Sequence, residues 1–167
     1  MTALTQMRLR ELLDYDPETG IFTRRVRMSN CAAGTPAGSL RDTGYISISV
    51  DDRAYRAHLL AWLWMTGEWP VGFLDHKNMN KSDNRWKNLR EANKSQNMAN
   101  RGSPLNNSSG LKGVSPYRAG SKYGKPWQAG IQKNGKKIHI GHFATPEEAH
   151  AAYCVAAEQL FGQFAKG

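Results

Sequence analysis

Two alternating segments, residues 127–132 and 136–143, are the feature that most constrains the fold, because Asn134-Gly135 joins them. Asn-Gly is the strongest short signal for a β-hairpin, since both turn positions of its tight turn need a positive φ. The alternation predicts one polar, basic face and one apolar face, the latter made of Trp127, Ala129, Ile131, Ile138 and Ile140. The preceding "KGVSPYR", residues 112–118, is a candidate for a third strand.

A helix is predicted directly after this hairpin. Thr145 can be its N-cap, Pro146 suits the first helical position, and Glu148 completes a capping box. Many small alanines let this helix lie close to a sheet, on the stripe Ala149, Ala152, Tyr153, Ala156 and Leu160. Residues 110–165 therefore predict a three-stranded antiparallel sheet with one helix on its apolar face.

The first part of the chain has its own sheet and helix signals. Residues 44–50 alternate, and Asp51-Asp52 leads into "RAYRAH", which predicts a hairpin. Residues 57–67 carry apolar side chains at helical spacing, and Gly67 suits the C-cap. Because "NRGSPLNNSSGLKG" is rich in turn residues, we predict an α+β chain with domains at 1–101 and 110–167 and a linker at 102–109.

Charge indicates a polyanionic partner. The formal net charge is +9, and between Glu91 and Glu147 the chain has no acidic residue and nine basic ones. A long basic stretch with aromatic residues is typical of nucleic-acid binding, although a solvated basic surface is the alternative.

The sequence shows no membrane or disulfide signal. No run approaches the roughly 18 apolar residues of a membrane span, and the N-terminal segment is acidic and amphipathic where a signal peptide would be apolar. We therefore expect an intracellular, cytoplasmic protein with no membrane partner. Cys31 and Cys154 are far apart and in no metal-ligand spacing, which predicts two small buried apolar residues.

The asparagine-rich segment "LDHKNMNKSDNRWKNLREANKSQN", residues 74–97, carries the candidate chemistry. Asp and Asn supply the hard oxygen ligands that Mg²⁺ or Mn²⁺ prefers, and a neighbouring histidine can act as a general base near neutral pH. These are the groups needed for metal-assisted hydrolysis of a phosphodiester. On a strand, however, Asp75 and His76 would point to opposite faces, so a further ligand must come from elsewhere.

Together with "RAHLLAWLWMTGEWP" and "SQNMANR", this segment resembles the HNH nuclease family, closely its phage and intron homing endonucleases, over residues 10–101. The resemblance implies a ββα-metal fold that binds one divalent ion, Mg²⁺ with Mn²⁺ as the alternative, and no small-molecule cofactor. It implies that Asp75 is the metal carboxylate, His76 the general base, Asn88 the asparagine that holds the loop, and Asn97 the second metal ligand. Asn100, one helical turn along, is the alternative to Asn97.

The implied mechanism is hydrolysis in which His76 takes a proton from the attacking water, leaving 5′-phosphate and 3′-hydroxyl ends. Lys77, Lys81 and Arg85 are predicted to neutralise backbone phosphates. Asp83 and Asn84 are interpreted as ordinary turn residues, with a site role as the alternative for Asn84. His58 is interpreted as structural, with a phosphate contact as the alternative, and core or lid roles are expected for Trp62, Trp64 and Trp69.

The C-terminal segment resembles the AP2 DNA-binding domain over residues 109–166, in "GLKGVSPYR", "WQAGIQ" and "HIGHFATPEEAHAAYCVAAEQLFGQFAK". That resemblance implies a sheet that lies in the major groove of double-stranded DNA. The implied DNA face is Ser115, Tyr117, Gln128, Gln132, Lys137 and His139, flanked by Arg118, Lys122, Lys125, Lys133 and Lys136. The linker is predicted to follow a DNA groove through Arg101, Asn106, Asn107 and Lys112.

These features favour a site-specific, metal-dependent DNA endonuclease of homing type, carried by a phage or mobile intron and acting in a bacterial host. Two other functions are open: a DNA-binding regulator with an inactive nuclease half, and an RNA-binding or RNA-cleaving protein, for which Tyr117 is the stacking candidate. A monomer is favoured, although no leucine stripe or obvious symmetric interface in the sequence decides the oligomeric state.

Overall fold

The computed structural model describes residues 3–28, 30–100, 102 and 107–165. The chain divides into two compact units, Met1–Glu91 (unit 1) and Ala92–Gly167 (unit 2). This division precedes the linker that the composition indicates, so the short helix of the asparagine-rich segment groups with the C-terminal part of the chain. Arg101 and Asn106, predicted to follow DNA, lie outside the described residues.

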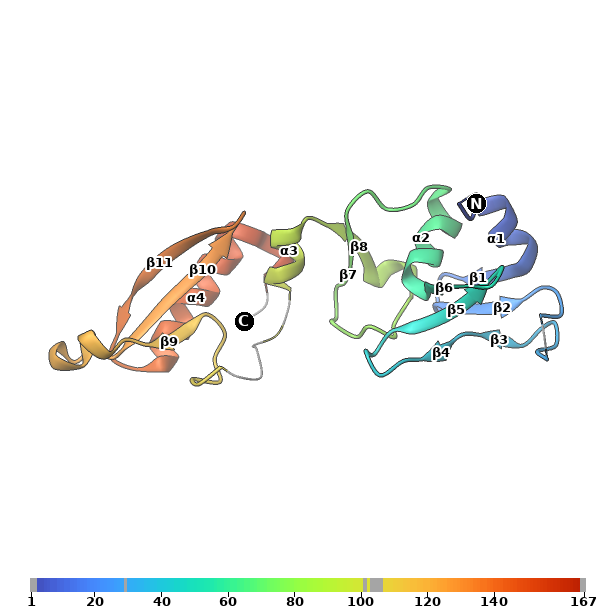
Figure 1. Ribbon diagram of the computed structural model, residues 1–167. Coiled ribbons are helices and arrows are strands. Elements are labelled where there is room, and N and C mark those ends of the chain that lie inside the picture. Colours follow the sequence, from blue (N-terminus) through green and yellow to red (C-terminus); the bar gives the residue numbers. More distant parts are fainter. Residues whose placement is uncertain (1–2, 29, 101, 103–106, 166–167) are drawn as a thin grey trace. The chain divides into compact units, whose positions relative to one another are not determined.

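Unit 1 contains two small antiparallel sheets and a third pair of strands (Figure 1). Strands β1-β2-β3 form one sheet, β4-β5-β6 the second, and β7 pairs with β8. In chain order the elements are α1 (Gln6–Leu12), β1 (Leu13–Asp16), β2 (Ile21–Arg24), β3 (Pro36–Ala37), β4 (Ser39–Leu40), β5 (Ile46–Val50), β6 (Arg53–Arg56), α2 (Ala57–Thr66), β7 (Phe73–His76), a 3₁₀ turn (Trp86–Asn88) and β8 (Leu89–Ala92).

The hairpin and helix predicted for residues 44–67 are confirmed. Asp51 and Asp52 adopt φ of 46° and 61° at the turn between β5 and β6. Gly67 caps α2 at φ 86°, a left-handed conformation that glycine adopts without a steric penalty. Helix α2 buries Leu60 and Leu63 in a core that it shares with α1, β1, β2 and β5. This core supports the end of β6 and the start of α2, next to the asparagine-rich segment.

Unit 2 is the sheet and helix that the Asn134-Gly135 hairpin predicts. Its elements are α3 (Lys94–Ala99), β9 (Val114–Pro116), a 3₁₀ turn (Arg118–Tyr123), β10 (Trp127–Lys133), β11 (Lys136–Phe143), α4 (Pro146–Phe161) and a 3₁₀ turn (Gly162–Phe164). The strand order is β11-β10-β9, antiparallel throughout, and α4 packs on one face of the sheet (Figure 1). Asn134 and Gly135 have φ of 50° and 81°.

Helix α4 begins at the predicted N-cap, but the Glu148 half of the predicted capping box was wrong and the buried stripe is different. The Thr145 hydroxyl accepts the Glu148 N–H, whereas the Glu148 carboxylate accepts the N–H of Ala144 instead of that of Thr145. The buried side chains are spaced by four residues: Ala149, Tyr153, Ala157 and Phe161. Of the predicted stripe, Ala149 and Tyr153 are buried and Leu160 packs half-buried against the core, whereas Ala156 is only half-buried beside the buried Ala157, because the helix meets the sheet along an i, i+4 row.

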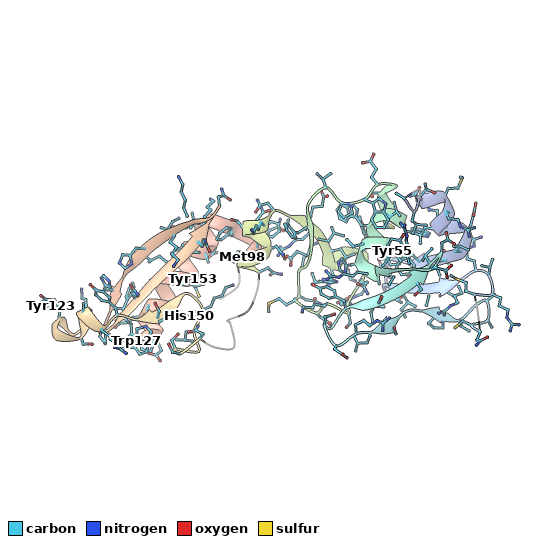
Figure 2. The ribbon with its side chains drawn as sticks, viewed as in Figure 1. Tyr55, Met98, Tyr123, Trp127, His150 and Tyr153 are labelled. Carbon is cyan, nitrogen blue, oxygen red and sulfur yellow. The ribbon has the colours of Figure 1, made fainter. Side chains whose placement is uncertain are left out.

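The close approach of α4 to the sheet depends on Gly113, since a Cβ there would collide with the Tyr153 ring (Figure 2 labels Tyr153 and His150 on α4). Trp127 is half-buried against this core. The strand register shifts between Ala129 and Gly130, and Ile138, near the hairpin turn, is 40% exposed. Ile138 was therefore wrongly predicted as core, because it lies at the end of the hairpin.

The cysteine prediction was also partly wrong. Cys31 is exposed, where it forms an isolated β-bridge with Met28, and Cys154 is half-buried with its Sγ 3.5 Å from His150 Nε2. Neither cysteine is in a disulfide. No helix in the described part of the chain has the length and apolar character needed to cross a membrane.

Candidate active site

Strand β7 ends on the two residues that the sequence singles out. Asp75 and His76 retain only 7% and 4% of their exposure. Successive side chains on a strand point to opposite faces, and the two residues do have different partners: Arg90 of β8 contacts Asp75, and Asn84 contacts His76. The two groups are thus held separately, each in its own environment.

Asp75 forms a buried ion pair. The Nε and Nη2 atoms of Arg90 lie 3.0 and 2.8 Å from Asp75 Oδ2, and both side chains are less than one-tenth exposed. Removing the cation from a buried ion pair costs free energy, because the carboxylate would remain in the interior as an uncompensated charge. The carboxylate is a hard oxygen donor of the kind that Mg²⁺ prefers, so its chemistry fits a divalent ion. In this structure its charge is paired with that of Arg90.

His76 lies against an amide and two aromatic rings. Its Nε2 is 3.4 Å from the amide oxygen of Asn84, and its ring meets those of His58 (centroids 4.9 Å apart) and Tyr45 (6.1 Å). Burial lowers the pKa of the His76 imidazole, with smaller opposing contributions from Asn84 and the nearby carboxylates. A neutral imidazole at neutral pH is the form that can accept a proton. Because an amide oxygen can only accept a hydrogen bond, the Asn84 contact favours the tautomer with its proton on Nε2 and its lone pair on Nδ1.

The loop between β7 and β8 is held by Asn88. Its side-chain oxygen accepts the Asn78 N–H (3.1 Å), and its amide nitrogen donates to Asn78 Oδ1 (3.0 Å) and to the Asp83 carbonyl (2.8 Å). Asn88 is only 6% exposed. These contacts suit the loop-holding role that the resemblance implies for this residue.

A second set of bonds tightens the same loop. Asp83 accepts from Arg85 Nε at 2.7 Å and from the Asn78 amide at 2.7 Å. The hydrogen bonds from Arg85 lower the pKa of Asp83 to about 2. Arg85, predicted as a phosphate contact, already has its charge compensated by Asp83.

Asn84 has more to do than its sequence interpretation as a turn residue allowed. It is 3% exposed, contacts His76, and its carbonyl accepts the Tyr15 hydroxyl at 2.6 Å. Gly20 is required beside it, because a Cβ there would collide with the backbone of Asn84 and Arg85. Tyr15 and Gly20 belong to β1 and the turn after it, far from Asn84 in the sequence, so the local pattern contained no signal for these two contacts.

His58 agrees with its structural interpretation. It is 3% exposed on α2, and burial, with a smaller contribution from the His76 charge, lowers the pKa of its imidazole to about 3. The tryptophans pack as expected: Trp64 and Trp69 lie against the unit 1 core, and the Trp62 ring contacts that of Trp86 at 5.1 Å.

The lysines of the loop are exposed. Lys77 donates to the Lys87 carbonyl and Lys81 to the Thr43 carbonyl, both through Nζ. Their aliphatic stems are thereby positioned, while their charges have no carboxylate partner in the part of the chain that the structure describes.

Helix α3 carries the predicted second ligand, Asn97, but groups with unit 2. Asn93 and Gln96 form a reciprocal capping box at its start. Asn97 is half-buried, whereas its alternative, Asn100, is the C-cap and only 3% exposed. Since Asp75 and Asn97 lie in different units, their joint role as metal ligands stays a prediction. In the described residues, no group of three or more His, Cys, Asp or Glu side chains is placed to hold a metal.

The polar face of the unit 2 sheet has a row of three side chains. Register places Ser115 and His142 on either side of Gln128, whose amide donates to the Ser115 hydroxyl at 3.2 Å. The Tyr117 ring stacks on His142 with centroids 4.0 Å apart, and His139 lies 4.5 Å from His142. His142 was missing from the predicted DNA face. Strict alternation from His139 assigns His142 to the opposite face, and the register shift between Ala129 and Gly130 interrupts that alternation.

Most of the remaining predicted DNA contacts are accessible. Gln132, Lys136, Lys137, His139, Ser115, Arg118 and Lys125 are exposed, and Tyr117, Gln128 and Lys133 are half-buried. Lys112 differs: it is 8% exposed, and its ammonium donates to the Ala99 carbonyl. A buried ammonium bonded to α3 is a packing group in this structure, which corrects its prediction as a DNA contact. The Lys122 side chain lies outside the described residues.

Comparison with known proteins finds a family that part of the chain is similar to. Residues 55–99 match the family model described as HNH endonuclease. An uncharacterized HNH endonuclease of Acanthamoeba polyphaga mimivirus is 34% identical over 93 residues, which cover 56% of this chain and 45% of the relative. The chain thus aligns with less than half the length of that relative. No solved structure matches the chain. Residues 55–99, from β6 to α3, are therefore similar to an HNH endonuclease domain.

Proposed function

We propose that this protein is a divalent-metal-dependent DNA endonuclease with His76 as its general base. The observation that carries the proposal is the buried His76 beside Asp75 at the end of β7, inside the segment that matches the HNH endonuclease family. A neutral imidazole and a carboxylate on neighbouring positions supply a proton acceptor and an anionic ligand next to one phosphate.

Each residue has a defined task in this proposal. His76 takes the proton of the water that attacks the phosphodiester, and Asn84 fixes the ring so that the accepting nitrogen faces that water. Asn88 keeps the loop folded around the site. Asp75 and Asn97 would hold one Mg²⁺ or Mn²⁺ ion, which supplies charge stabilisation to the departing 3′ oxygen when bound.

The proposal extends to unit 2 as the targeting part of a site-specific enzyme of homing type, borne by a phage or mobile intron. An AP2-like use of the sheet would place its polar face in the major groove of double-stranded DNA. The exposed Gln132, Lys137 and His139 support this proposal, because amide and cationic side chains can pair with base edges and phosphates. A tethered base-reading sheet raises the effective concentration of the nuclease at its target.

The second candidate is a DNA-binding regulator that does not cut. The Arg90–Asp75 ion pair is the observation that favours it, because a guanidinium on Oδ2 occupies the carboxylate where a metal would bind. In that case the site would be a structural ion pair, and binding would be independent of divalent ions.

Incubation with supercoiled plasmid carrying the neighbourhood of the gene separates the two candidates. The wild type and His76→Ala are compared with Mg²⁺, Mn²⁺ or EDTA, and nicked and linear products are scored. Metal-dependent cutting that is lost in the variant supports the nuclease, whereas binding with no cutting by the wild type supports the regulator. Competition with RNA tests the preference for duplex DNA.

A further inference from the structure

Tyr45, just before β5, is contacted by two cations at once. The guanidinium carbon of Arg56 lies 4.5 Å from the centre of the Tyr45 ring, and Lys81 Nζ lies 5.1 Å from it. The three residues come from three separate segments: the end of the β4–β5 loop, the end of β6, and the β7–β8 loop. Each cation is attracted to the face of the ring, although like charges repel, so the fold must hold the two cations at this ring.

Several contacts hold this arrangement in place. Lys81 Nζ donates to the Thr43 carbonyl at 3.0 Å, and its stem runs past Gly44, where an added Cβ would lie 3.5 Å from Lys81 Cδ. Arg56 pairs with Ser47 in the β5–β6 ladder and is the residue from which α2 begins. Lys81 is thus held at its ammonium and Arg56 at its backbone.

The same ring faces the candidate base. Tyr45 lies 6.1 Å from the His76 ring and 5.2 Å from the His58 ring, measured between centroids. His76 and His58 are buried, whereas Arg56 and Lys81 are exposed. The two cations therefore line the solvent side of the ring cluster that contains His76.

Neither charge is compensated within the described residues. The ion pairs of unit 1 involve Arg8, Arg85, Arg90 and Lys87, and none includes Arg56 or Lys81. An anion that reached both of these cations would be attracted to each of them. A DNA phosphate is an anion of the right charge, and its oxygens can accept from both a guanidinium and an ammonium.

We propose that Arg56 and Lys81, spread over the Tyr45 ring, form a binding site for one backbone phosphate of the DNA strand that His76 cleaves. This inference rests on the proposed function for the identity of the cleaved strand. Tyr45 acts as the platform that keeps the two cations apart and aims them at the strand. The site binds phosphate without reading sequence, so it contributes equally on any duplex.

Another arginine in unit 1 supplies a matched control. Arg10 lies 4.5 Å from the centre of the Trp64 ring, the same distance as Arg56 from Tyr45, and it donates to the Trp64 carbonyl at 2.8 Å. Arg10 is on α1, and these two contacts join it to Trp64 of α2. Lys87, exposed and paired with Glu18, serves the same purpose for Lys81.

The test measures DNA binding of the full chain in EDTA by fluorescence anisotropy, on a labelled duplex, over a range of salt concentrations. The variants are Arg56→Gln and Lys81→Gln, with Arg10→Gln and Lys87→Gln as controls of equal charge change. The slope of log affinity against log salt is negative, and each lost phosphate contact makes it shallower by about 0.9. We expect the two site variants to share the loss of one phosphate, so that Arg56→Gln combined with Lys81→Gln makes the slope shallower by little more than either alone.

Tyr45→Phe and Tyr45→Leu complete the set. The phenylalanine keeps the ring and should bind as the wild type does, whereas the leucine should make the salt slope shallower as the charge variants do. Thermal unfolding of each variant identifies any that fail to fold, and a misfolded Tyr45→Leu leaves the two charge variants and Tyr45→Phe to decide. Salt slopes for Arg56→Gln and Lys81→Gln that equal those of the two controls would overturn the proposal.

Plasmid cutting by the wild type distinguishes this result from the fate of the proposed function. A wild type that never cuts, with the slope lost in both site variants, upholds the phosphate site and rejects the nuclease. Cutting by the wild type with unchanged slopes in both site variants rejects the phosphate site and upholds the nuclease.

Discussion

The two units use polar residues in opposite ways. In unit 1 the candidate chemical groups are buried: Asp75, His76, Asn84 and Asn88 are each less than one-tenth exposed. In unit 2 the candidate DNA-binding groups lie on an open sheet face, where Gln132, Lys137 and His139 are exposed. The first set is satisfied by partners within the chain, whereas the second is available to a partner from outside.

This difference follows from the cost of burying polar atoms. A buried polar group must keep its hydrogen bonds, which fixes its position, so burial both orients His76 and makes the site part of the fold. An exposed group has no such constraint, so its substitution leaves stability nearly unchanged. Changes at the buried polar groups of unit 1 should therefore affect chemistry and folding, and changes on the unit 2 sheet should affect binding alone.

The largest expected effect is the loss of the base. His76→Ala should lower the single-turnover cleavage rate by about 10²–10⁴-fold, because general base catalysis contributes that much. His139→Ala is the matched histidine change on the sheet of unit 2 and should leave the rate at saturating protein unchanged. The measurement is quenched cleavage of a labelled duplex, and equal rates for His76→Ala and the wild type would remove His76 from the mechanism.

Loss of the loop contacts should come next. Asn88→Ala removes the three side-chain hydrogen bonds to Asn78 and Asp83, and the groups left behind are partly buried. We expect about 1–3 kcal/mol of lost stability for the unsatisfied partners. The measurement is chemical denaturation followed by circular dichroism.

Asn30→Ala, at an exposed asparagine of the same unit, is the control for that experiment and should stay within about 0.5 kcal/mol of the wild type. If Asn88→Ala is as stable as Asn30→Ala, Asn88 does not hold the loop.

A smaller effect is expected on the sheet. Gln132 and Lys137 lie opposite each other in the β10–β11 ladder and are both exposed, and each is replaced by alanine. Each should weaken DNA binding, by about 1–3 kcal/mol where the side chain pairs with a base, with no change in unfolding temperature. Binding in EDTA by anisotropy checks this, and unchanged affinity in both variants would place DNA on another surface.

How much of this the sequence predicted depends on the range of the interactions. The hairpin at Asn134-Gly135, the Thr145 cap and the Gly67 cap were predictable, because each is determined by a few neighbouring residues. The pairing of Asp75 with Arg90 and the bond from Tyr15 to Asn84 were not, because they join segments that only tertiary packing brings together.

Periodicity alone also has a limited resolution. It predicted a helix on a sheet but misplaced its buried row, since Ala156 and Ala157 differ by one position on an alanine-rich helix and composition cannot separate them. The charge pattern has the same limit at Lys112. The sequence shows a lysine in a basic stretch but does not show that this lysine is buried and bonded to Ala99.

The smallest expected effect is a pH dependence in the loop. The pKa of Asp83 is lowered to about 2, compared with about 3.9 in an unfolded chain. A lowered folded-state pKa stabilises the protein above the unfolded value, and that stabilisation is lost as the pH falls from about 4 to about 2. The unfolding midpoints of the wild type and Asp83→Asn should therefore differ at pH 6 and converge as the pH falls. A difference that is constant across that range would mean that Asp83 is not held by Arg85.

The division between buried chemistry and exposed binding is tested most directly by single-turnover cleavage as a function of protein concentration. This experiment gives a maximal rate and a half-saturating concentration for each protein. The comparison includes the wild type, His76→Ala, and a sheet variant that combines Gln132→Ala, Lys137→Ala and His139→Ala. We predict that His76→Ala lowers only the maximal rate and that the sheet variant raises only the half-saturating concentration. A sheet variant that lowers the maximal rate as His76→Ala does, with unchanged half-saturation, would contradict the account.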